Sequence, residues 1–238
     1  MQAVILAGGL GTRLRPLTYE VPKPMVPIHG KPYLAHQLAV LRAQGFDDVV
    51  LLTGYLGEQI EEYFGNGEAV GLRLRYSREM SPIGTGGALL QALPLLAPSF
   101  LLLYGDSFLP IRYGEVLGLL EPVPFTQLVL TAYDNGGGNT SVNNNLYVDA
   151  AGRVAAYEKG TDNPQLNYVE AGVLALRRDA LALLPDTVPV SLEHLLFPRL
   201  IADGQVRAFL TTERFYDFGT PERLAETESF FRSYTPVP

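Results

Sequence analysis

Short apolar runs alternate with segments of helical periodicity through the first half of the chain. A continuous apolar run is typical of a buried strand, and apolar residues three or four positions apart are typical of a helix with one packed face. Residues 33–43 show the helical pattern through Leu34, Leu38 and Leu41. The two patterns predict strands at 2–6, 49–52, 72–76 and 100–104, and helices at 33–43, 58–64 and 85–96. This alternation predicts an α/β fold with a parallel sheet and helices on both faces.

The second half of the chain is less regular. It predicts strands at 127–133, 146–148, 154–157 and 169–176, a hairpin turn at 149–152, and helices at 192–202 and 221–231. No long linker interrupts the sequence, so we expect one domain over residues 1–238. Its Gly/Asn-rich run, residues 136–145, is consistent either with a mobile loop at a ligand site or with a loose connection.

Composition narrows the class of ligand. The chain has 238 residues, 47% of them hydrophobic, and a formal net charge of −7. Such acidity disfavours nucleic acid, which requires clustered Lys and Arg, but it leaves room for a small phosphorylated ligand. There is no cysteine and the three histidines are scattered, so disulfides and a zinc site are not expected.

A membrane span is also not expected. Residues 80–105 carry no charge, but Pro82, Pro94 and Pro98 interrupt them, and a helix followed by a buried strand explains them better. The first residues lead directly into the first strand without a basic, signal-like segment. We therefore expect a soluble, cytoplasmic protein, either a monomer or a homo-oligomer.

The loop after the first strand carries the most chemical information. Glycines that follow a parallel strand let backbone N–H groups approach phosphate oxygens, and Arg13 adds a permanently charged fork. The loop lacks the Gly-Lys-Ser/Thr ending of a P-loop, and Leu14 replaces the third glycine of a dinucleotide-binding fingerprint. An isolated Gly-Gly pair would indicate only a tight turn.

Residues 8–18, GGLGTRLRPLT, followed by Pro22-Lys23-Pro24-Met25, resemble the signature of the sugar nucleotidyltransferase family. The resemblance implies a Rossmann-like three-layer α/β/α fold with a mostly parallel sheet and a smaller sugar-binding β region. It further implies that residues 1–133 bind a nucleoside triphosphate and that residues 134–238 bind a sugar 1-phosphate and close the site. The nucleotide-binding residues it implies in this segment are Leu6, Ala7, Gly8, Gly9, Gly11, Thr12, Arg13 and Lys23.

Residues 82–88, PIGTGGA, resemble the second glycine-rich element of the family, which lies against the base and the ribose. The element also opens a predicted helix, whose first N–H groups are free to donate. This element adds Gly84, Thr85 and Gly86 to the expected nucleotide site, and the segment before it adds Glu79.

Two aspartates are expected to hold Mg²⁺. Asp106 follows the fourth predicted strand, and Asp217 precedes a Gly-Thr-Pro element; both match metal-binding aspartates of the family. Mg²⁺ prefers one or two carboxylates together with phosphate oxygens. A lone aspartate at a strand end would otherwise be interpreted as a turn residue.

The sugar-phosphate site follows from weaker matches. Glu158 and Lys159 are similar to a Glu-Lys pair of the family, although Gly160 replaces the proline that often follows it. Glu170 and Gly172 lie in the next matching element, and we add Asn143 and Asp106 to the expected sugar-phosphate residues.

The reaction implied is attack of a sugar-1-phosphate oxygen on the α-phosphorus of the triphosphate, with release of pyrophosphate. Arg13, Lys23 and Asp106 are the expected catalytic residues. A glycosyltransferase that uses Asp106, or a nucleotide-binding regulatory module without turnover, remains an alternative. Within the family, residues 76–87 and 105–108 look closer to heptose-1-phosphate guanylyltransferases, which use GTP, than to N-acetylmuramate-1-phosphate uridylyltransferases.

Overall fold

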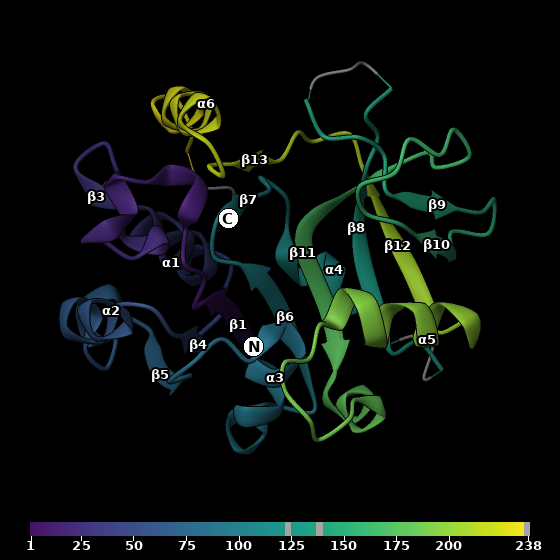
Figure 1. Ribbon diagram of the computed structural model, residues 1–238, viewed down its shortest axis with the longest axis horizontal. Helices are drawn as coiled ribbons and strands as arrows, with labels where there is room; N and C mark the ends of the chain where they lie inside the picture. Colours follow the sequence, from purple (N-terminus) through teal and green to yellow (C-terminus); the bar gives the residue numbers. More distant parts are fainter. Residues whose placement is uncertain (122–124, 137–139, 236–238) are drawn as a thin grey trace.

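A seven-stranded sheet forms the centre of the computed structural model, which describes residues 1–121, 125–136 and 140–235 (Figure 1). The strand order is β12-β8-β11-β6-β1-β4-β5. The strands are β1 (Gln2–Ala7), β4 (Asp48–Thr53), β5 (Arg73–Arg78), β6 (Ser99–Tyr104), β8 (Leu128–Tyr133), β11 (Val169–Arg177) and β12 (Val206–Thr211).

The first half of the sheet is parallel, as the sequence predicts. β6, β1, β4 and β5 run in one direction, and Ile5 lies opposite Leu51 on one side and Leu103 on the other. β11 is antiparallel to both of its neighbours, while β12 and β8 pair in parallel. The mostly parallel Rossmann-like fold is therefore confirmed.

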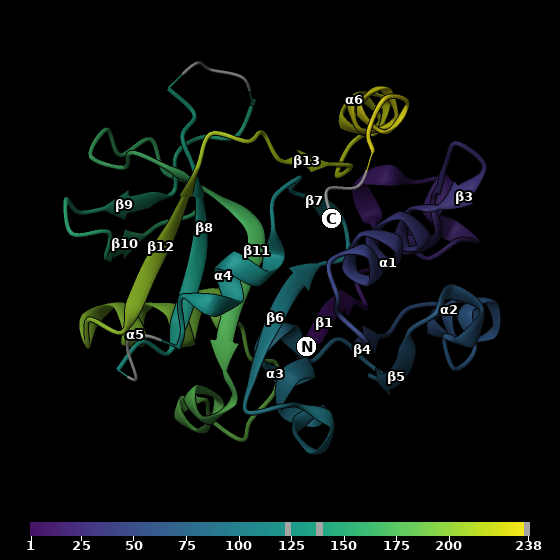
Figure 2. The same cartoon turned by 180° about the vertical axis from the view of Figure 1, so that it is seen from behind.

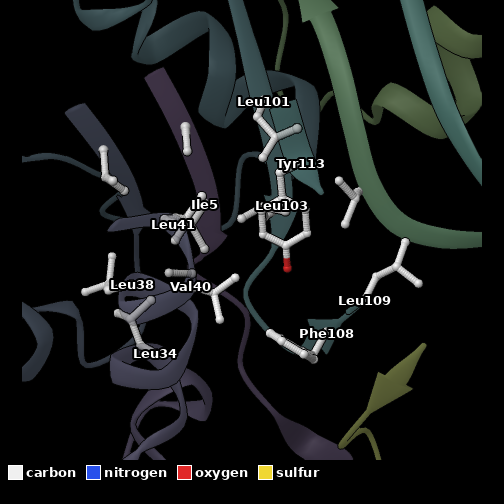
Figure 3. Packing of buried hydrophobic residues seen from close by; sticks show 14 of the residues in the cluster. Ile5, Leu34, Leu38, Val40, Leu41, Leu101, Leu103, Phe108, Leu109 and Tyr113 are labelled. Carbon is white, nitrogen blue, oxygen red and sulfur yellow. The ribbon is translucent and has the colours of Figure 1, made fainter. Parts of the chain in front are cut away.

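Both faces of the sheet are buried, because alternate residues of each central strand point to opposite sides. Ala3 and Ile5 of β1 belong to one core cluster and Val4 to the other. The first face is covered by α1 (Tyr33–Ala43), α2 (Gly57–Phe64) and α4 (Tyr113–Gly118), and Figure 3 shows Leu41 of α1 beside Ile5. The second face is covered by α3 (Gly84–Gln91), α5 (Phe197–Ala202) and the hairpin β9 (Leu146–Val148) and β10 (Val154–Tyr157).

The C-terminal segment returns from β12 to the N-terminal half of the molecule (Figures 1 and 2). There β13 (Tyr216–Asp217) pairs with β7 (Ser107–Phe108), and α6 (Pro221–Phe231) begins after the Thr220 cap. Asp217 lies opposite Ser107 in this pair. Two segments 110 residues apart in the sequence therefore bring Asp217 close to Asp106. The remaining short strands are β2 (Pro27–Ile28) and β3 (Lys31–Pro32).

The structure differs from the predictions in several local details. The helix expected at 85–96 ends at Gln91, because Pro94 cannot donate to a continuing α-helix, and a 3₁₀ turn follows at Leu93–Leu95. β12 and α4 were not predicted; β12 is an edge strand with few fully buried positions. The helix predicted at 192–202 begins with a π-helical turn, Leu192–Leu196, before α5.

Part of the Gly/Asn-rich run 136–145, namely residues 137–139, lies outside the described residues. Among the helices that are described, none combines the length and the apolar character that a bilayer span requires.

Candidate active site

A cavity of about 500 Å³ opens at the carboxyl ends of β1, β4 and β6. Ligands of open α/β sheets bind at this edge, where loops that follow neighbouring strands meet. The predicted nucleotide residues that line it are Leu6, Ala7, Gly8, Gly9, Gly11, Thr12, Arg13, Lys23, Glu79, Gly84 and Thr85. The structure thus gathers the expected nucleotide site in one place, apart from Gly86.

The glycines of the first loop occupy their positions for different structural reasons. Gly11 has φ +61°, and a Cβ there would lie 2.9 Å from the Thr18 Cγ2 atom. A Cβ on Gly8 would lie 2.9 Å from Oε1 of Glu79, whereas a Cβ on Gly9 would have no neighbour within 4 Å. Gly11 is therefore required by its backbone conformation and its packing, a side chain at Gly8 would displace the Glu79 carboxylate, and Gly9 leaves the backbone open to the cavity.

The second glycine-rich element packs against the segment before η7, the π-helical turn Leu192–Leu196. Gly84 has φ +79°, and a Cβ there would lie 2.3 Å from the Val190 carbonyl oxygen. Gly86 donates its N–H to the same carbonyl at 2.8 Å and does not line the cavity. The packing of Gly86 explains its small size without a ligand.

Lys23 and Asp106, which both line the cavity, form an ion pair. The Lys23 side chain is 11% exposed, and its Nζ contacts Oδ2 of Asp106 and lies 5.3 Å from the ring centroid of Phe218. Asp106 is held on its other oxygen by Ser107, whose hydroxyl donates to Oδ1 at 3.2 Å. Pro22 and Pro24 flank the lysine and place it in a short 3₁₀ turn, Lys23–Met25.

A second cavity, of about 270 Å³, shares Arg13, Tyr104 and Asp106 with the first. Four of the six predicted sugar-phosphate residues, Asp106, Lys159, Glu170 and Gly172, line it. Two others do not. Asn143 donates to Asp162 at 2.7 Å, and the Glu158 carboxylate accepts from Asn163 in a separate hollow.

Asp217 also lines the second cavity, where its carboxylate is bound from two directions. Gly219 donates its N–H to Oδ1 at 2.9 Å, and the Arg223 guanidinium lies 3.0 Å from Oδ2. Arg223 also donates to the Ser141 hydroxyl at 2.9 Å. Over residues 1–121, 125–136 and 140–235, no group of three or more His, Cys, Asp or Glu side chains is placed to hold a metal ion.

Glu170 is the most perturbed carboxyl of the second cavity. It is 8% exposed; its Oε1 accepts from the Gly172 N–H at 2.6 Å, and its own N–H donates to Asn145. Burial raises the pKa of Glu170 to about 7, although Lys159 and the Gly172 N–H oppose the rise. Lys159 itself lies 5.8 Å and 5.7 Å from the ring centroids of Tyr104 and Tyr157.

Two cations that line these cavities have no acidic partner within 4.0 Å in the described part of the chain: Arg13 and Lys159. Positive charge without a local counterion suits a polyanionic ligand. Polar residues that line the second cavity but were not among the expected site residues include Tyr104, Asn145 and Arg223. Tyr104 directly precedes the recognised Gly-Asp pair, so its position was a usable signal, whereas Asn145 is one of three consecutive asparagines.

A family model described as Nucleotidyl transferase matches residues 2–233. The chain belongs to this family. It is 32% identical over 225 residues to the D-glycero-alpha-D-manno-heptose 1-phosphate guanylyltransferase of Campylobacter jejuni, covering 93% of this chain and 96% of the relative. It is also 32% identical to the mannose-1-phosphate guanylyltransferase of Mycobacterium tuberculosis, covering 100% of this chain and 67% of the relative. These relatives confirm the assignment to the sugar-1-phosphate nucleotidyltransferases.

Two solved structures have the same fold as this chain. HddC from Yersinia pseudotuberculosis, solved in complex with GMP-PN, superposes with a TM-score of 0.78 and 27% identity, covering 97% of this chain and 99% of that chain. A putative glucose-1-phosphate thymidylyltransferase from Bacillus anthracis gives a TM-score of 0.84 at 17% identity, which supports the fold alone.

Proposed function

We propose that this protein transfers a guanylyl group from GTP to a heptose 1-phosphate, releasing pyrophosphate. The observation that carries the proposal is that two cavities share Arg13, Tyr104 and Asp106. Two ligands bound side by side would meet at these residues. A reaction between two phosphorylated substrates requires this arrangement.

The preference for GTP is supported by Glu79. This half-buried carboxylate lines the larger cavity beside Gly8, and its Oε2 accepts from the Ile83 N–H at 3.2 Å. Guanine presents two adjacent N–H donors, N1–H and the N2 amino group, to which a carboxylate can bind with both oxygens. Uracil and thymine present one N–H that lies between two carbonyl oxygens. A carboxylate repels these carbonyl oxygens.

The smaller cavity is proposed to hold the sugar 1-phosphate. Its buried Glu170 and Asn145 can bind hydroxyl groups, and its Lys159 can offset phosphate charge. The names of the heptose-1-phosphate relatives support a heptose as the sugar. Glu158 and Asn143 stay proposals, and neither of them lines this cavity.

The proposed step forms a bond between a sugar-phosphate oxygen and the α-phosphorus and breaks the α–β bridge, whose electron pair leaves with pyrophosphate. A phosphate monoester has its second pKa at about 6, so its oxygen is anionic at neutral pH and needs no general base. The protein's contribution is to hold two polyanions together and offset their repulsion. We assign this work to Arg13, Lys23 and the backbone of Gly8, Gly9 and Gly11.

Asp106 and Asp217 fit a divalent metal ion such as Mg²⁺, because they are two hard carboxylates that line one cavity. A protein set of two carboxylates suits Mg²⁺ that completes its coordination with substrate phosphates and water. When bound, the ion would supply charge stabilisation on the reacting phosphates. In the described structure Lys23 and Arg223 neutralise these two carboxylates.

The expected cytoplasmic location stays a prediction.

Pyrophosphate release tests the proposal directly. GTP, CTP, UTP, dTTP and ATP are each combined with a panel of sugar 1-phosphates that includes heptoses, mannose and N-acetylmuramate, in the presence of Mg²⁺. The proposal requires GTP with a heptose 1-phosphate to give the highest kcat/KM. A UTP preference with N-acetylmuramate 1-phosphate would overturn it in favour of the uridylyltransferase, and nucleotide binding without release would favour the regulatory module.

A further inference from the structure

The carboxylate of Glu193 lies behind the two cavities and lines neither of them. Glu193 belongs to the π-helical turn Leu192–Leu196 and is only 9% exposed. Glu193 has no part in the proposed transfer of the guanylyl group. A buried carboxylate is costly unless hydrogen bonds compensate its lost hydration, so its partners indicate what it does.

Three hydroxyl groups donate to this carboxylate. Thr85 and Ser191 donate to Oε2, at 2.8 and 2.7 Å, and Tyr104 donates to Oε1 at 2.8 Å. Burial alone would raise the pKa of Glu193, but the hydrogen bonds from its own backbone N–H, Ser191, Thr85 and Tyr104 outweigh it and lower the pKa. The group is therefore a charged acceptor at neutral pH.

Two of these donors belong to the substrate cavities. Thr85 lies in the first turn of α3 and lines the larger cavity, and its Oγ1 also accepts from the Leu192 N–H at 2.9 Å. Tyr104 ends β6 and lines both cavities. With its hydroxyl bound to Glu193, the Tyr104 ring is fixed in the position over which the Lys159 ammonium lies.

We propose that Glu193 is a positioning residue that orients Thr85 on the nucleotide side and Tyr104, and through its ring Lys159, on the sugar-phosphate side. One buried side chain thereby sets the geometry of both substrate cavities. The inference rests on the proposed function for the identity of the two substrates. The hydrogen bonds of Glu193 on which the inference depends do not depend on which base and which sugar the substrates carry.

The test measures binding and turnover for Glu193→Gln, which keeps the shape of the side chain but can no longer accept from all three hydroxyl groups. We expect the Kd of GTP and the Kd of heptose 1-phosphate, each measured alone by calorimetry, to rise on the order of 10-fold. Both KM values are expected to rise with them, while kcat changes less. Thr85→Val is expected to reproduce the nucleotide effect.

Tyr104→Phe removes a single oxygen and keeps the inference testable if Glu193→Gln fails to fold. It is expected to weaken heptose 1-phosphate more than GTP. The double variant Glu193→Gln/Tyr104→Phe is expected to bind heptose 1-phosphate no more weakly than Glu193→Gln alone, because both changes break the same hydrogen bond between Tyr104 and Glu193.

Asp48→Asn is the matched control. Asp48 is a second buried carboxylate, bound by Gln2 and Arg75 at the amino end of β4, away from both cavities. This change is expected to lower the melting temperature and leave both Kd values unchanged. Glu193→Gln that behaves in the same way, or Tyr104→Phe that binds both substrates normally, would overturn the inference.

If wild-type enzyme prefers another nucleotide and sugar, the proposed function fails and the same variants are measured with the preferred pair. If wild-type enzyme shows no turnover, the Kd values alone decide. The two failures are therefore distinguishable.

Discussion

Arg223 donates to both carboxylate oxygens of Asp217, at 3.2 and 3.0 Å, from the first turn of the helix that follows it. Thr227, one turn further along α6, donates its hydroxyl to the Asp217 carbonyl at 3.1 Å. These bonds fix the backbone and the side chain of Asp217 to one rigid element. The C-terminal helix therefore determines where this carboxylate points within the second cavity.

Replacing Arg223 with Gln is expected to lower kcat/KM on the order of 10-fold, because Asp217 loses its charged partner and its fixed orientation. Steady-state kinetics at several Mg²⁺ concentrations measure the effect. Arg214→Gln is the control: Arg214 pairs with Glu226 of the same helix but does not line the second cavity. Equal kinetics for the two variants would contradict this role of Arg223.

Lys23→Ala is expected to reduce turnover on the order of 10²-fold, because it removes the cation that we propose offsets charge between the two substrates. The variant also leaves Asp106 without its ion-pair partner. The measurements are kcat from pyrophosphate release and the melting temperature from circular dichroism. Lys31→Ala, at an exposed lysine of β3, is the control, and a folded Lys23→Ala enzyme with normal turnover would rule out the assigned role.

Chelation by EDTA is expected to stop pyrophosphate release, and added Mg²⁺ is expected to restore it. Asp217→Asn should require a higher Mg²⁺ concentration for half-maximal rate, because an amide is a weaker ligand for this ion than a carboxylate. Asp203→Asn, at an exposed position after α5, should not change the Mg²⁺ requirement. A rate that is indifferent to EDTA would exclude the metal.

Glu170 gives the protein a stability that falls as pH rises. Its pKa is raised from 4.5 to about 7, so the folded state binds a proton more tightly than the unfolded state does. Between these two values the unfolded chain releases the proton first, and the free energy of unfolding therefore decreases with pH. The full penalty, on the order of 3 kcal/mol, is reached above pH 7.

Urea unfolding at pH 5 and pH 8 measures this effect. Glu170→Gln, which cannot ionise, is expected to flatten the pH dependence and to be more stable than the wild type at pH 8. A variant whose stability changes with pH as much as that of the wild type would show that Glu170 does not titrate in this range.

The sequence predicted those parts of the fold and the site that depend on short segments. The strand and helix pattern fixed the parallel half of the sheet, and the loop motif located Gly8, Gly11 and Arg13 in one cavity. The burial of single side chains was predicted less well: Tyr63 of α2 is 59% exposed, and Leu93, in the 3₁₀ turn after α3, is 36% exposed. Both are apolar residues that periodicity alone assigns to a core.

Contacts between distant segments could not be predicted. Glu193 meets Thr85 across 108 residues, and Ser141 meets Arg223 across 82 residues. Neither pair has a local spacing that would reveal it, because the sheet order brings the segments together. For the same reason Asn145 was overlooked in favour of Asn143, two residues away in the same polar run.

Glu79→Gln is expected to weaken the preference for GTP. Guanine would lose one of two hydrogen bonds to the carboxylate and would face the amide N–H₂ group instead, a change worth on the order of 10-fold in kcat/KM. The kcat/KM values for UTP and dTTP should not fall, because a glutamine can donate to the carbonyl oxygens of these bases and accept from their N3–H. Burial raises the pKa of Glu79, so a neutral side chain at this position should not reduce the free energy of unfolding.

The comparison is the ratio of kcat/KM for GTP to that for UTP in the wild type, in Glu79→Gln and in Glu62→Gln, an exposed control on α2. An equal loss with both nucleotides would mean that Glu79 supports the cavity without reading the base.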